Sequence, residues 1–331
     1  MDDSVNSLNH KILTLLGKGS SIDDMQVIQE LWGGYGQLLR LTLTGNKQRN
    51  SIIAKYIQLP ELDKLAHPRG WNTPLSHQRK LMSYQVEFHW YANYVKRMPT
   101  GWVPECLSSF KEGSHYLLVL QDLRDIGRAR VVTQATQSEI MSVLNWLAQF
   151  HAFWLGERPD GLWDQGSYWH LSTRPDELLS MTNTRYQRAA RTLDKLLEEC
   201  PYKTIIHGDA KLANFCFEEE GDAVSGVDFQ YVGAGVGVKD VVLLLTSVLD
   251  FNKSDIDLAP YLSHYFSSLK HALEVYQPTV ESREVCEMWS RIFDLAWADF
   301  QRFLLGWCPT HWKVNEFTMA LTDKALERHG L

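Results

Sequence analysis

The sequence predicts an α+β chain with two lobes, a small N-terminal lobe containing an antiparallel sheet and a larger, mainly helical C-terminal lobe. Its 331 residues, 44% hydrophobic and 22% charged, are enough for two cores. Up to about residue 125, short β-rich runs are separated by turn residues. From about residue 136, long amphipathic helical patterns dominate. We therefore expect a boundary that divides the chain into residues 1–125 and 126–331.

The N-terminal lobe is expected to hold three strands, a helix and two more strands. Within residues 24–57, the runs "DMQVIQEL", "QLLRLTL" and "SIIAKYI" alternate with the turn-forming "GGYG" and "TGNKQRN". Residues 76–98 have apolar side chains at helical spacing, and Ser76 is available as the N-cap. The runs "ECLSSFKE" and "HYLLVLQDL" then complete the sheet.

The C-terminal lobe is expected to be helical around one short β island. The island consists of "KTIIHG", "NFCFEE" and "AVSGVDF", so its polar residues lie on loops between short strands. Asp240 heads one of the expected helices, where it either caps the helix or braces a neighbouring loop. The expected helices are residues 138–155, 176–200, 240–251, 259–276 and 281–307.

Composition excludes several classes of function. The formal net charge of -7 argues against a protein that binds a nucleic-acid backbone. The acidic start "MDDSVNSLNHK" does not resemble a secretory signal, and the longest apolar run, "VVLLLTSVL", is too short to span a bilayer. The 5 cysteines are scattered, which indicates reduced thiols. We expect a cytoplasmic protein without a membrane span; its oligomeric state stays open.

The β island contains the two motifs that predict function. "HGDAKLAN" covers residues 207–214, and "VDFQ" covers residues 227–230. With these motifs the chain resembles the kinase-like small-molecule phosphotransferases of the aminoglycoside phosphotransferase and choline kinase superfamily, most closely the ecdysteroid-kinase-like branch. The resemblance implies a bilobal protein-kinase-like fold. It also implies transfer of the γ-phosphoryl group of ATP, with Mg²⁺, to a hydroxyl group of a small molecule.

The resemblance gives the loop residues their expected roles. Asp209 would accept or orient the proton of the attacking hydroxyl, and Asn214 and Asp228 would supply the hard oxygen ligands that Mg²⁺ prefers. Lys211 would place positive charge near the transferred group, although the similar branch usually carries tryptophan there. The alternatives are that Asp209 and Asn214 only form a tight turn and that Lys211 is a solvated loop lysine. His207 is expected to brace the loop.

The N-terminal lobe is expected to bind the nucleotide. By resemblance, Lys55 contacts the α and β phosphates and Glu87 on the following helix holds it; Lys55 and Asp228 should then face one cleft. The alternatives are an exposed lysine on the sheet and a solvated helix carboxylate. The remaining expected nucleotide contacts are the glycine loop over the phosphates and the hinge at adenine: Gly33, Gly34, Gly36, Gln121, Asp122 and Leu123.

The acceptor is expected to bind in the helical lobe. Within residues 281–307, six aromatic or leucine side chains recur at three or four residues and share one helix face, which is core or part of a pocket. Trp163, Tyr168 or Trp169, with Asp294 or Asp299, could complete that pocket for a choline-like, steroid-like or other alcohol with a substantial apolar or quaternary-ammonium part. The six are Trp289, Phe293, Trp297, Phe300, Leu304 and Trp307.

Two other functions are alternatives. A protein kinase would need an activation loop, and only about a dozen residues separate Asp228 from the helix at Asp240. A nucleotide-binding pseudokinase-type module predicts loss of at least one of Asp209, Asn214, Asp228 and Lys55, and all of them are present. A small-molecule kinase therefore remains the favoured function.

Overall fold

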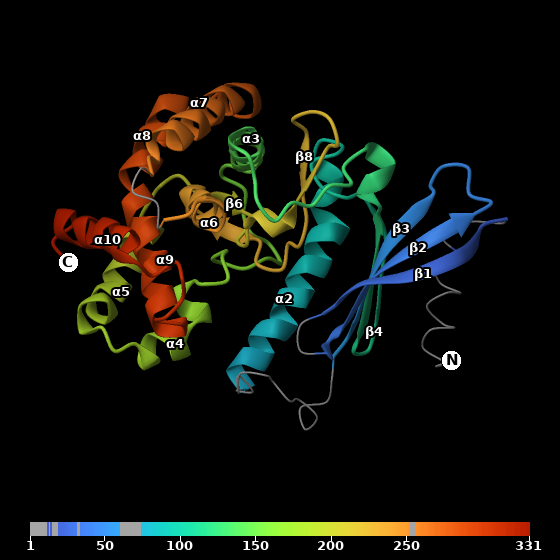
Figure 1. Cartoon of the computed structure of the whole chain (residues 1–331), viewed down its shortest axis with the longest axis horizontal. Helices are drawn as coiled ribbons and strands as arrows, with labels where there is room; N and C mark the ends of the chain where they lie inside the picture. Colours follow the sequence, from blue (N-terminus) through green and yellow to red (C-terminus); the bar gives the residue numbers. More distant parts are fainter. Residues whose placement is uncertain (1–11, 13, 15–18, 32–33, 60–73, 252–255) are drawn as a thin grey trace. The chain divides into compact units, whose positions relative to one another are not determined.

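The computed structural model describes residues 12, 14, 19–31, 34–59, 74–251 and 256–331. The chain forms two compact units, which Figure 1 draws in the colours of the sequence. The first unit comprises residues 1–130 and 216–227, and the second comprises residues 131–215 and 228–331. The domain boundary predicted at residue 125 stays a prediction.

The first unit is built on one antiparallel sheet, as predicted. Its strand order is β1-β2-β3-β5-β4, and each neighbouring pair is antiparallel. Aliphatic side chains of β2, β3 and β5 that point to one face, among them Leu39, Ile52 and Val119, form a buried cluster. The strands are β1 (Ser21–Glu30), β2 (Gly36–Thr44), β3 (Ser51–Gln58), β4 (Cys106–Glu112) and β5 (His115–Gln121).

Helix α2 (Pro74–Asn93) packs against β4 and β5 of this sheet. Tyr84 and Trp90 on the helix are fully buried, which anchors it. The predicted N-cap at Ser76 is wrong, because the helix already begins at Pro74, whose fixed φ suits the first turn. The short strands β7 (Phe215–Phe217) and β8 (Val224–Gly226) pair with each other.

The second unit is mainly helical, as predicted, and α9 is its central helix. Figure 1 shows α4, α5, α6 and α10 around α9, and all four contact it. Helices α3 and α7 pack side by side. The helices are α3 (Gln137–Phe153), α4 (Pro175–Ser180), α5 (Thr184–Glu198), α6 (Val238–Val248), α7 (Ala259–Tyr276), α8 (Ser282–Arg291), α9 (Phe293–Trp307) and α10 (Glu316–Arg328).

Two predicted helices are each divided in the structure. The helix expected over residues 176–200 breaks before Asn183, whose side chain accepts the first N–H groups of α5 as an N-cap. The helix expected over residues 281–307 breaks at Ile292, so Trp289 lies on a different helix from Trp297. Two elements were not predicted: β9 (Gly233–Gly235), which pairs with β6 (Thr204–Ile206), and α10.

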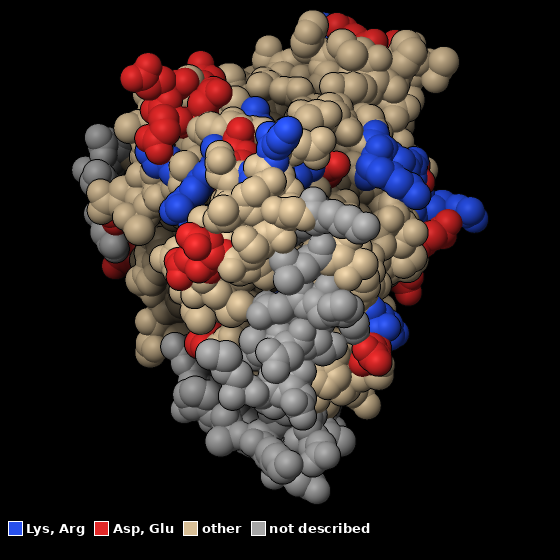
Figure 2. Space-filling model, turned by 90° about the vertical axis from the view of Figure 1, so that its right-hand side faces the viewer, with Lys and Arg blue, Asp and Glu red and all other residues tan. Residues whose placement is uncertain are grey.

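The thiols are free, and the surface in Figure 2 carries charges of both signs. On the face in Figure 2, positive and negative side chains are interspersed, and the described part of that face shows no broad basic surface. Each of the 5 cysteines is unpaired. Among the described helices, none is both long and apolar enough to cross a membrane.

Candidate functional site

The candidate site begins where β6 ends, and Gly208 shapes its first turn. Gly208 has φ +78°, a conformation that side chains with a Cβ rarely adopt. A Cβ there would lie 2.0 Å from the carbonyl oxygen of Tyr231. The turn therefore requires glycine, and it directs the next residue, Asp209, out of the strand.

Asp240 braces this loop from α6. Its carboxylate is fully buried and accepts the backbone N–H groups of His207 (2.6 Å) and Gly208 (2.9 Å). His151 Nε2 lies 3.1 Å from the same carboxylate, and its Nδ1 lies 2.8 Å from the Tyr265 hydroxyl. Since the carboxylate can only accept, Nε2 carries the proton and Nδ1 accepts from Tyr265. Of the two roles weighed for Asp240, the structure therefore shows the brace.

Asp209 is buried within a polar cluster of the same loop. Its carboxylate accepts from Lys211 Nζ at 2.8 Å and from Asn214 Nδ2 at 3.1 Å. Its backbone N–H donates to His207 Nδ1, so His207 braces the loop as predicted. Burial raises the pKa of Asp209 above its ordinary value, Lys211 opposes that rise, and the charge of Asp228 adds to it. A carboxylate with a raised pKa is a stronger base.

Lys211 is more exposed than Asp209: 45% of its side chain is accessible, against 10% for Asp209. Burial alone lowers the pKa of Lys211, but the attraction and hydrogen bond of Asp209 outweigh burial and raise it above its ordinary value. Lys211 is thus a cation held beside Asp209 with one side open to solvent. Lys211 is paired with Asp209 and is also solvent-exposed, so its expected role at the transferred phosphoryl group stays a prediction.

Asn214 is held so that its amide oxygen can meet a cation. It lies at the end of the turn η6 (Leu212–Asn214) and is buried. Its Nδ2 donates to both the backbone oxygen (2.8 Å) and the carboxylate of Asp209. With the nitrogen committed to Asp209, the oxygen is the atom left for a metal ion.

Asp228 follows β8 in a strained conformation. Its φ is +66°. Among the described residues that are not glycine, Asp228 and Ser167 are the two with a positive φ. Gln230 Nε2 donates to Asp228 Oδ1 at 2.7 Å, which orients the carboxylate. Strain of this kind is maintained by surrounding structure and is found often at functional sites. One carboxylate and one amide oxygen are ligands that suit Mg²⁺ when phosphate and water complete its shell.

In the first unit, Lys55 and Glu87 form a buried ion pair. Lys55 on β3 is 5% exposed and Glu87 on α2 is 1% exposed, and Nζ lies 2.7 Å and 2.6 Å from the two carboxylate oxygens. The structure therefore contradicts both alternatives, the solvent-facing lysine and the solvated helix carboxylate. The predicted partnership of the two residues is present.

The glycine loop is only partly described. Gly33 lies outside the described residues. A Cβ on Gly36 would lie 2.0 Å from the carbonyl oxygen of Tyr56, so the hairpin itself requires Gly36. Gly34 has φ +76°, and a Cβ placed on it would meet no heavy atom within 4 Å, so its backbone is open on that side.

The side chains of the predicted hinge, residues 121–123, are buried or bonded to other residues of the first unit. Asp122 accepts from Arg40 Nε (2.6 Å) and Ser51 Oγ (2.7 Å), and these contacts, opposing the effect of burial, hold its pKa below the ordinary value. Gln121 and Leu123 are also buried. Any contact of this segment with a nucleotide base must therefore come from backbone groups.

Tyr168 lies against the Asp209 loop in the second unit. Its N–H donates to the carbonyl oxygen of Gly208 at 3.1 Å. Its ring meets those of Tyr231 and Phe303 edge-on, at centroid distances of 5.9 Å and 5.5 Å. Burial, together with the negative charge of Asp209, raises the pKa of Tyr168 far above its ordinary value. Aromatic surface therefore lies close to the carboxylate.

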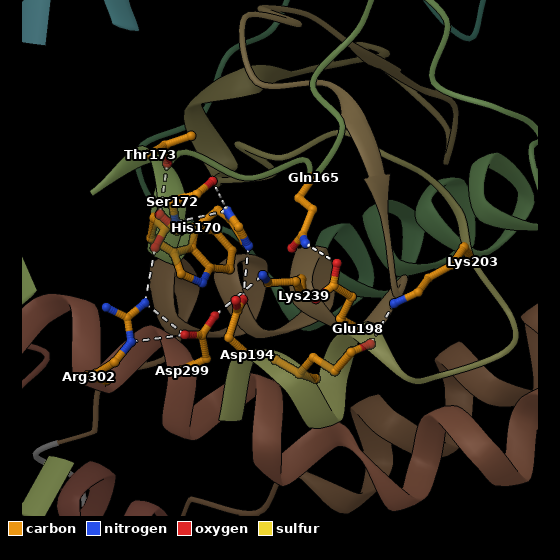
Figure 3. Close-up of polar contacts among 12 residues, drawn as sticks. Gln165, His170, Ser172, Thr173, Asp194, Glu198, Lys203, Lys239, Asp299 and Arg302 are labelled. Carbon is orange, nitrogen blue, oxygen red and sulfur yellow. Dashed lines mark hydrogen bonds and ion pairs between the residues drawn. The ribbon is translucent and has the colours of Figure 1, made fainter. Parts of the chain in front are cut away.

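A buried charge network holds the segment that carries Tyr168 (Figure 3). Arg302 on α9 donates through Nη2 to the carbonyl oxygen of Trp169 (3.2 Å) and to Asp299 Oδ1 (2.7 Å). Lys239 Nζ lies 3.4 Å from Asp299 Oδ2. Burial raises the pKa of Asp299, but Arg302 and Lys239 outweigh burial and hold it below its ordinary value. Asp299 is thus committed to the interior of the second unit.

The other acceptor residues expected from the sequence divide between core and surface. Trp289 and Trp297 are buried, and each indole N–H donates to a backbone oxygen, so both belong to the core. Asp294 is paired with Arg328. Trp163 is partly exposed, and its ring stacks on Tyr231 at 6.1 Å. Trp163 and Tyr168 thus remain the candidates for contact with an acceptor.

Sequence analysis missed two residues of this region, His151 and Lys313. His151 lies on α3, far along the chain from Asp240, and a lone histidine in an amphipathic helix gives no signal of its partner. Lys313 precedes α10, and its buried ammonium interacts electrostatically with both Asp209 and Lys211. A single lysine between two helices looks like any surface lysine in a sequence.

Comparison with known proteins supports the fold. A family described as "Phosphotransferase enzyme family" matches residues 74–278, more than half of the chain. No curated protein sequence matches the chain.

Two solved structures show the same architecture. The choline kinase from Cryptosporidium parvum Iowa II superposes with a TM-score of 0.54 at 10% identity, covering 99% of this chain and 96% of that chain. The amicoumacin kinase hAmiN, in complex with AMP-PNP, Ca²⁺ and Ami, gives 0.53 at 12% identity and covers 99% and 95%. These likenesses confirm the predicted kinase-like fold, whereas the ecdysteroid-kinase-like branch stays a prediction.

Proposed function

Because this chain belongs to the phosphotransferase enzyme family, we propose that it moves the γ-phosphoryl group of ATP to a hydroxyl group of a small molecule, with Mg²⁺. The observation that carries the proposal is the buried Asp209, paired with Lys211 and Asn214 in a loop that Asp240 holds rigid. This arrangement provides a base, a cation and a metal ligand within one short segment.

Asp209 acts as the base. The acceptor hydroxyl oxygen forms a bond to the γ-phosphorus, the bond from that phosphorus to the bridging oxygen breaks, and ADP leaves. Asp209 orients the hydroxyl and takes its proton, a role typically worth ~10²- to 10⁴-fold in rate. Lys211, held 2.8 Å from the carboxylate, offers positive charge to the transferred group.

Asn214 and Asp228 would hold Mg²⁺, which neutralises charge on the phosphates when bound. The donor set fits this ion, because Asn214 has its amide nitrogen committed to Asp209 and Gln230 orients Asp228. In the described residues no group of three or more His, Cys, Asp and Glu side chains gathers as a metal site. A site that depends on one carboxylate and one amide therefore suits a metal that arrives with the nucleotide.

The first unit supplies the nucleotide contacts in this proposal. Lys55 binds the α and β phosphates, and Glu87 fixes the ammonium in place through two contacts below 3 Å. Gly34 and Gly36 lie over the phosphates, and the backbone of residues 121–123 contacts adenine. The approach of Lys55 and Asp228 to a common nucleotide stays a prediction.

The acceptor is proposed to be an alcohol with a flat apolar part. Tyr168, close to Asp209, and Trp163, stacked on Tyr231, provide surfaces for such a compound. Both Asp294 and Asp299 are engaged by arginines, so neither carboxylate is proposed to bind the acceptor. The aromatic faces suit steroid-like or other apolar alcohols and also the quaternary ammonium group of a choline-like alcohol.

The protein-kinase alternative is disfavoured by the segment after Asp228. β9 begins at Gly233 and α6 begins at Val238, so this segment is occupied by regular structure. It leaves no room for a loop that would bind a peptide. The pseudokinase-type alternative is disfavoured because the residues it would be expected to lose are all present: Asp209, Asn214, Asp228 and Lys55.

The proposal is tested by incubating the protein with ATP, Mg²⁺ and a panel of alcohols. We expect production of ADP that depends on one class of alcohol, with a gain of one phosphoryl group in that alcohol by mass spectrometry. Asp228→Ala should abolish turnover that depends on metal. Absence of any phosphorylated alcohol across apolar, sugar and amino alcohols would contradict the proposed function.

A further inference from the structure

We propose that Lys313 forms an anion-binding subsite of the acceptor site, so that the acceptor alcohol carries a carboxylate or a similar anionic group. The inference rests on the proposed function, because it describes the compound that the Asp209 loop phosphorylates. Lys313 lies between α9 and α10, and nothing in the sequence motifs assigns it a role.

Lys313 is an unusual buried cation. In the described part of the chain, the buried lysines and arginines are Lys55, Lys239, Arg302 and Lys313. The first three each pair with a buried carboxylate. No described carboxylate lies within ion-pair distance of the Lys313 ammonium, which has one hydrogen bond, a long one of 3.4 Å to Thr246 Oγ1. A buried charge without a direct ion-pair partner is costly, so this lysine is not explained by packing.

Hydrogen bonds hold the backbone of Lys313, so its side chain begins at a fixed position. Its carbonyl oxygen accepts from Thr318 Oγ1 (2.8 Å) and from Gln301 Nε2 (3.1 Å), both buried. Its N–H donates to His311 Nδ1 at 3.2 Å. Three interactions on one residue's backbone keep the start of the lysine side chain in place.

The ammonium group faces the catalytic loop. Thr246, its partner on α6, is followed by Ser247, whose hydroxyl accepts the N–H of Leu212 in that loop at 3.0 Å. Burial lowers the pKa of Lys313 to about 8; the nearby charge of Asp209 opposes this decrease, and that of Lys211 adds to it. The contact with Thr246 places the ammonium beside the part of α6 that holds the loop of the proposed base.

Two aromatic rings lie close to this ammonium. Its Nζ lies 5.3 Å from the ring centre of Phe300 and 5.5 Å from that of Trp312. Phe300 neighbours Phe303, which contacts Tyr168 beside Asp209. A flat acceptor on these rings could present its hydroxyl to Asp209 and an anionic group to Lys313. The anion would supply the direct ion-pair partner that no described carboxylate provides.

The test uses matched trios of flat hydroxymethyl compounds, each with a carboxylate, its methyl ester and a quaternary ammonium in the same position; para-hydroxymethyl benzoate heads the first trio. Phosphorylated product is measured by mass spectrometry with ATP and Mg²⁺. The wild-type protein should prefer the carboxylates. Lys313→Met should raise their KM by about tenfold to a hundredfold, with kcat and the esters little changed, as expected for a lost contact to a charged group.

Controls separate the outcomes. Lys313→Arg should keep much of the preference, and Lys324→Met, which removes an exposed charge from α10, should change nothing. If Lys313→Met does not fold by circular dichroism, Lys313→Gln takes its place. A wild-type preference for the esters or the quaternary ammonium compounds overturns the inference but leaves the proposed function standing. An equal loss of activity of Lys313→Met toward all three members of a trio has the same meaning. If no alcohol is phosphorylated, the proposed function itself has failed.

Discussion

Replacing Asp240 tests how the catalytic loop is held. The carboxylate accepts three hydrogen bonds in a fully buried position: two from the backbone of His207 and Gly208 and one from His151. In Asp240→Asn, one oxygen becomes an NH₂ group that faces a donor, which leaves that donor unsatisfied at a cost of about 1–3 kcal/mol. The other two bonds lose the assistance of charge, at about 1 kcal/mol each. We therefore expect a loss of roughly 3–5 kcal/mol, a large part of the ~5–15 kcal/mol that stabilises a typical domain.

The assay is urea unfolding followed by tryptophan fluorescence, with the rate of phosphoryl transfer measured beside it. Asp240→Asn should lower both the unfolding midpoint and kcat, because the loop that presents Asp209 loses its anchor. Glu220→Gln, at an exposed position, serves as the control and should change stability by less than about 0.5 kcal/mol. An Asp240→Asn protein as stable as wild type would refute the bracing role.

Three further predictions concern the turn, the nucleotide and the base. Gly208→Ala should lower the free energy of unfolding by more than about 2 kcal/mol, because the new Cβ would meet backbone at 2.0 Å and φ is +78°. Gly113→Ala, with φ +57° and open space around the new Cβ, should lower it less. Equal urea midpoints for the two variants would contradict this prediction. Lys55→Met should raise the KM for ATP about tenfold or more in steady-state assays, and an unchanged KM would remove Lys55 from the phosphates. Asp209 must be ionised to act as a base, and burial raises its pKa. As the pH is lowered, kcat should therefore begin to fall at a higher pH than an ordinary carboxyl group would cause. In Lys211→Met the acid limb should move to still higher pH, because the lysine lowers that pKa; an unmoved limb would contradict the assignment.

Much of the fold could be predicted because local patterns determine it. Period-two runs between turn residues identified the strands of the first unit, and Asn183 had the residue type of an N-cap within residues 176–200. The break at Ile292 had no such signal, because apolar residues continue at helical spacing through it. β9 is short and consists of "GAG", which has no strand propensity of its own. Tertiary packing decides both features.

The candidate site could be predicted only where its residues lie close together in the chain. Asp209, Lys211 and Asn214 share one loop, so their proximity follows from their spacing. The contacts of His151 with Asp240 and of Lys313 with Thr246 join residues 89 and 67 positions apart. A single sequence carries no measure of such distances, and therefore it could not identify these residues.

The roles of the tryptophans show the same limit. A recurring aromatic stripe predicts a helix face, but the spacing is identical for a face that packs in the core and a face that lines a pocket. In the structure Trp289 and Trp297 are buried and hydrogen-bonded to backbone. Burial, which depends on neighbouring helices, separates the two meanings.

The most direct test of the central claim is the single-turnover rate of Asp209→Asn with Mg²⁺, ATP and the best alcohol from the screen. The substitution preserves size but removes the base. We predict that the affinity for Mg²⁺ and ATP stays within a few-fold of wild type while the rate falls by ~10²- to 10⁴-fold. An Asp209→Asn protein that transfers phosphoryl groups within a few-fold of the wild-type rate would contradict the assignment of Asp209 as the catalytic base.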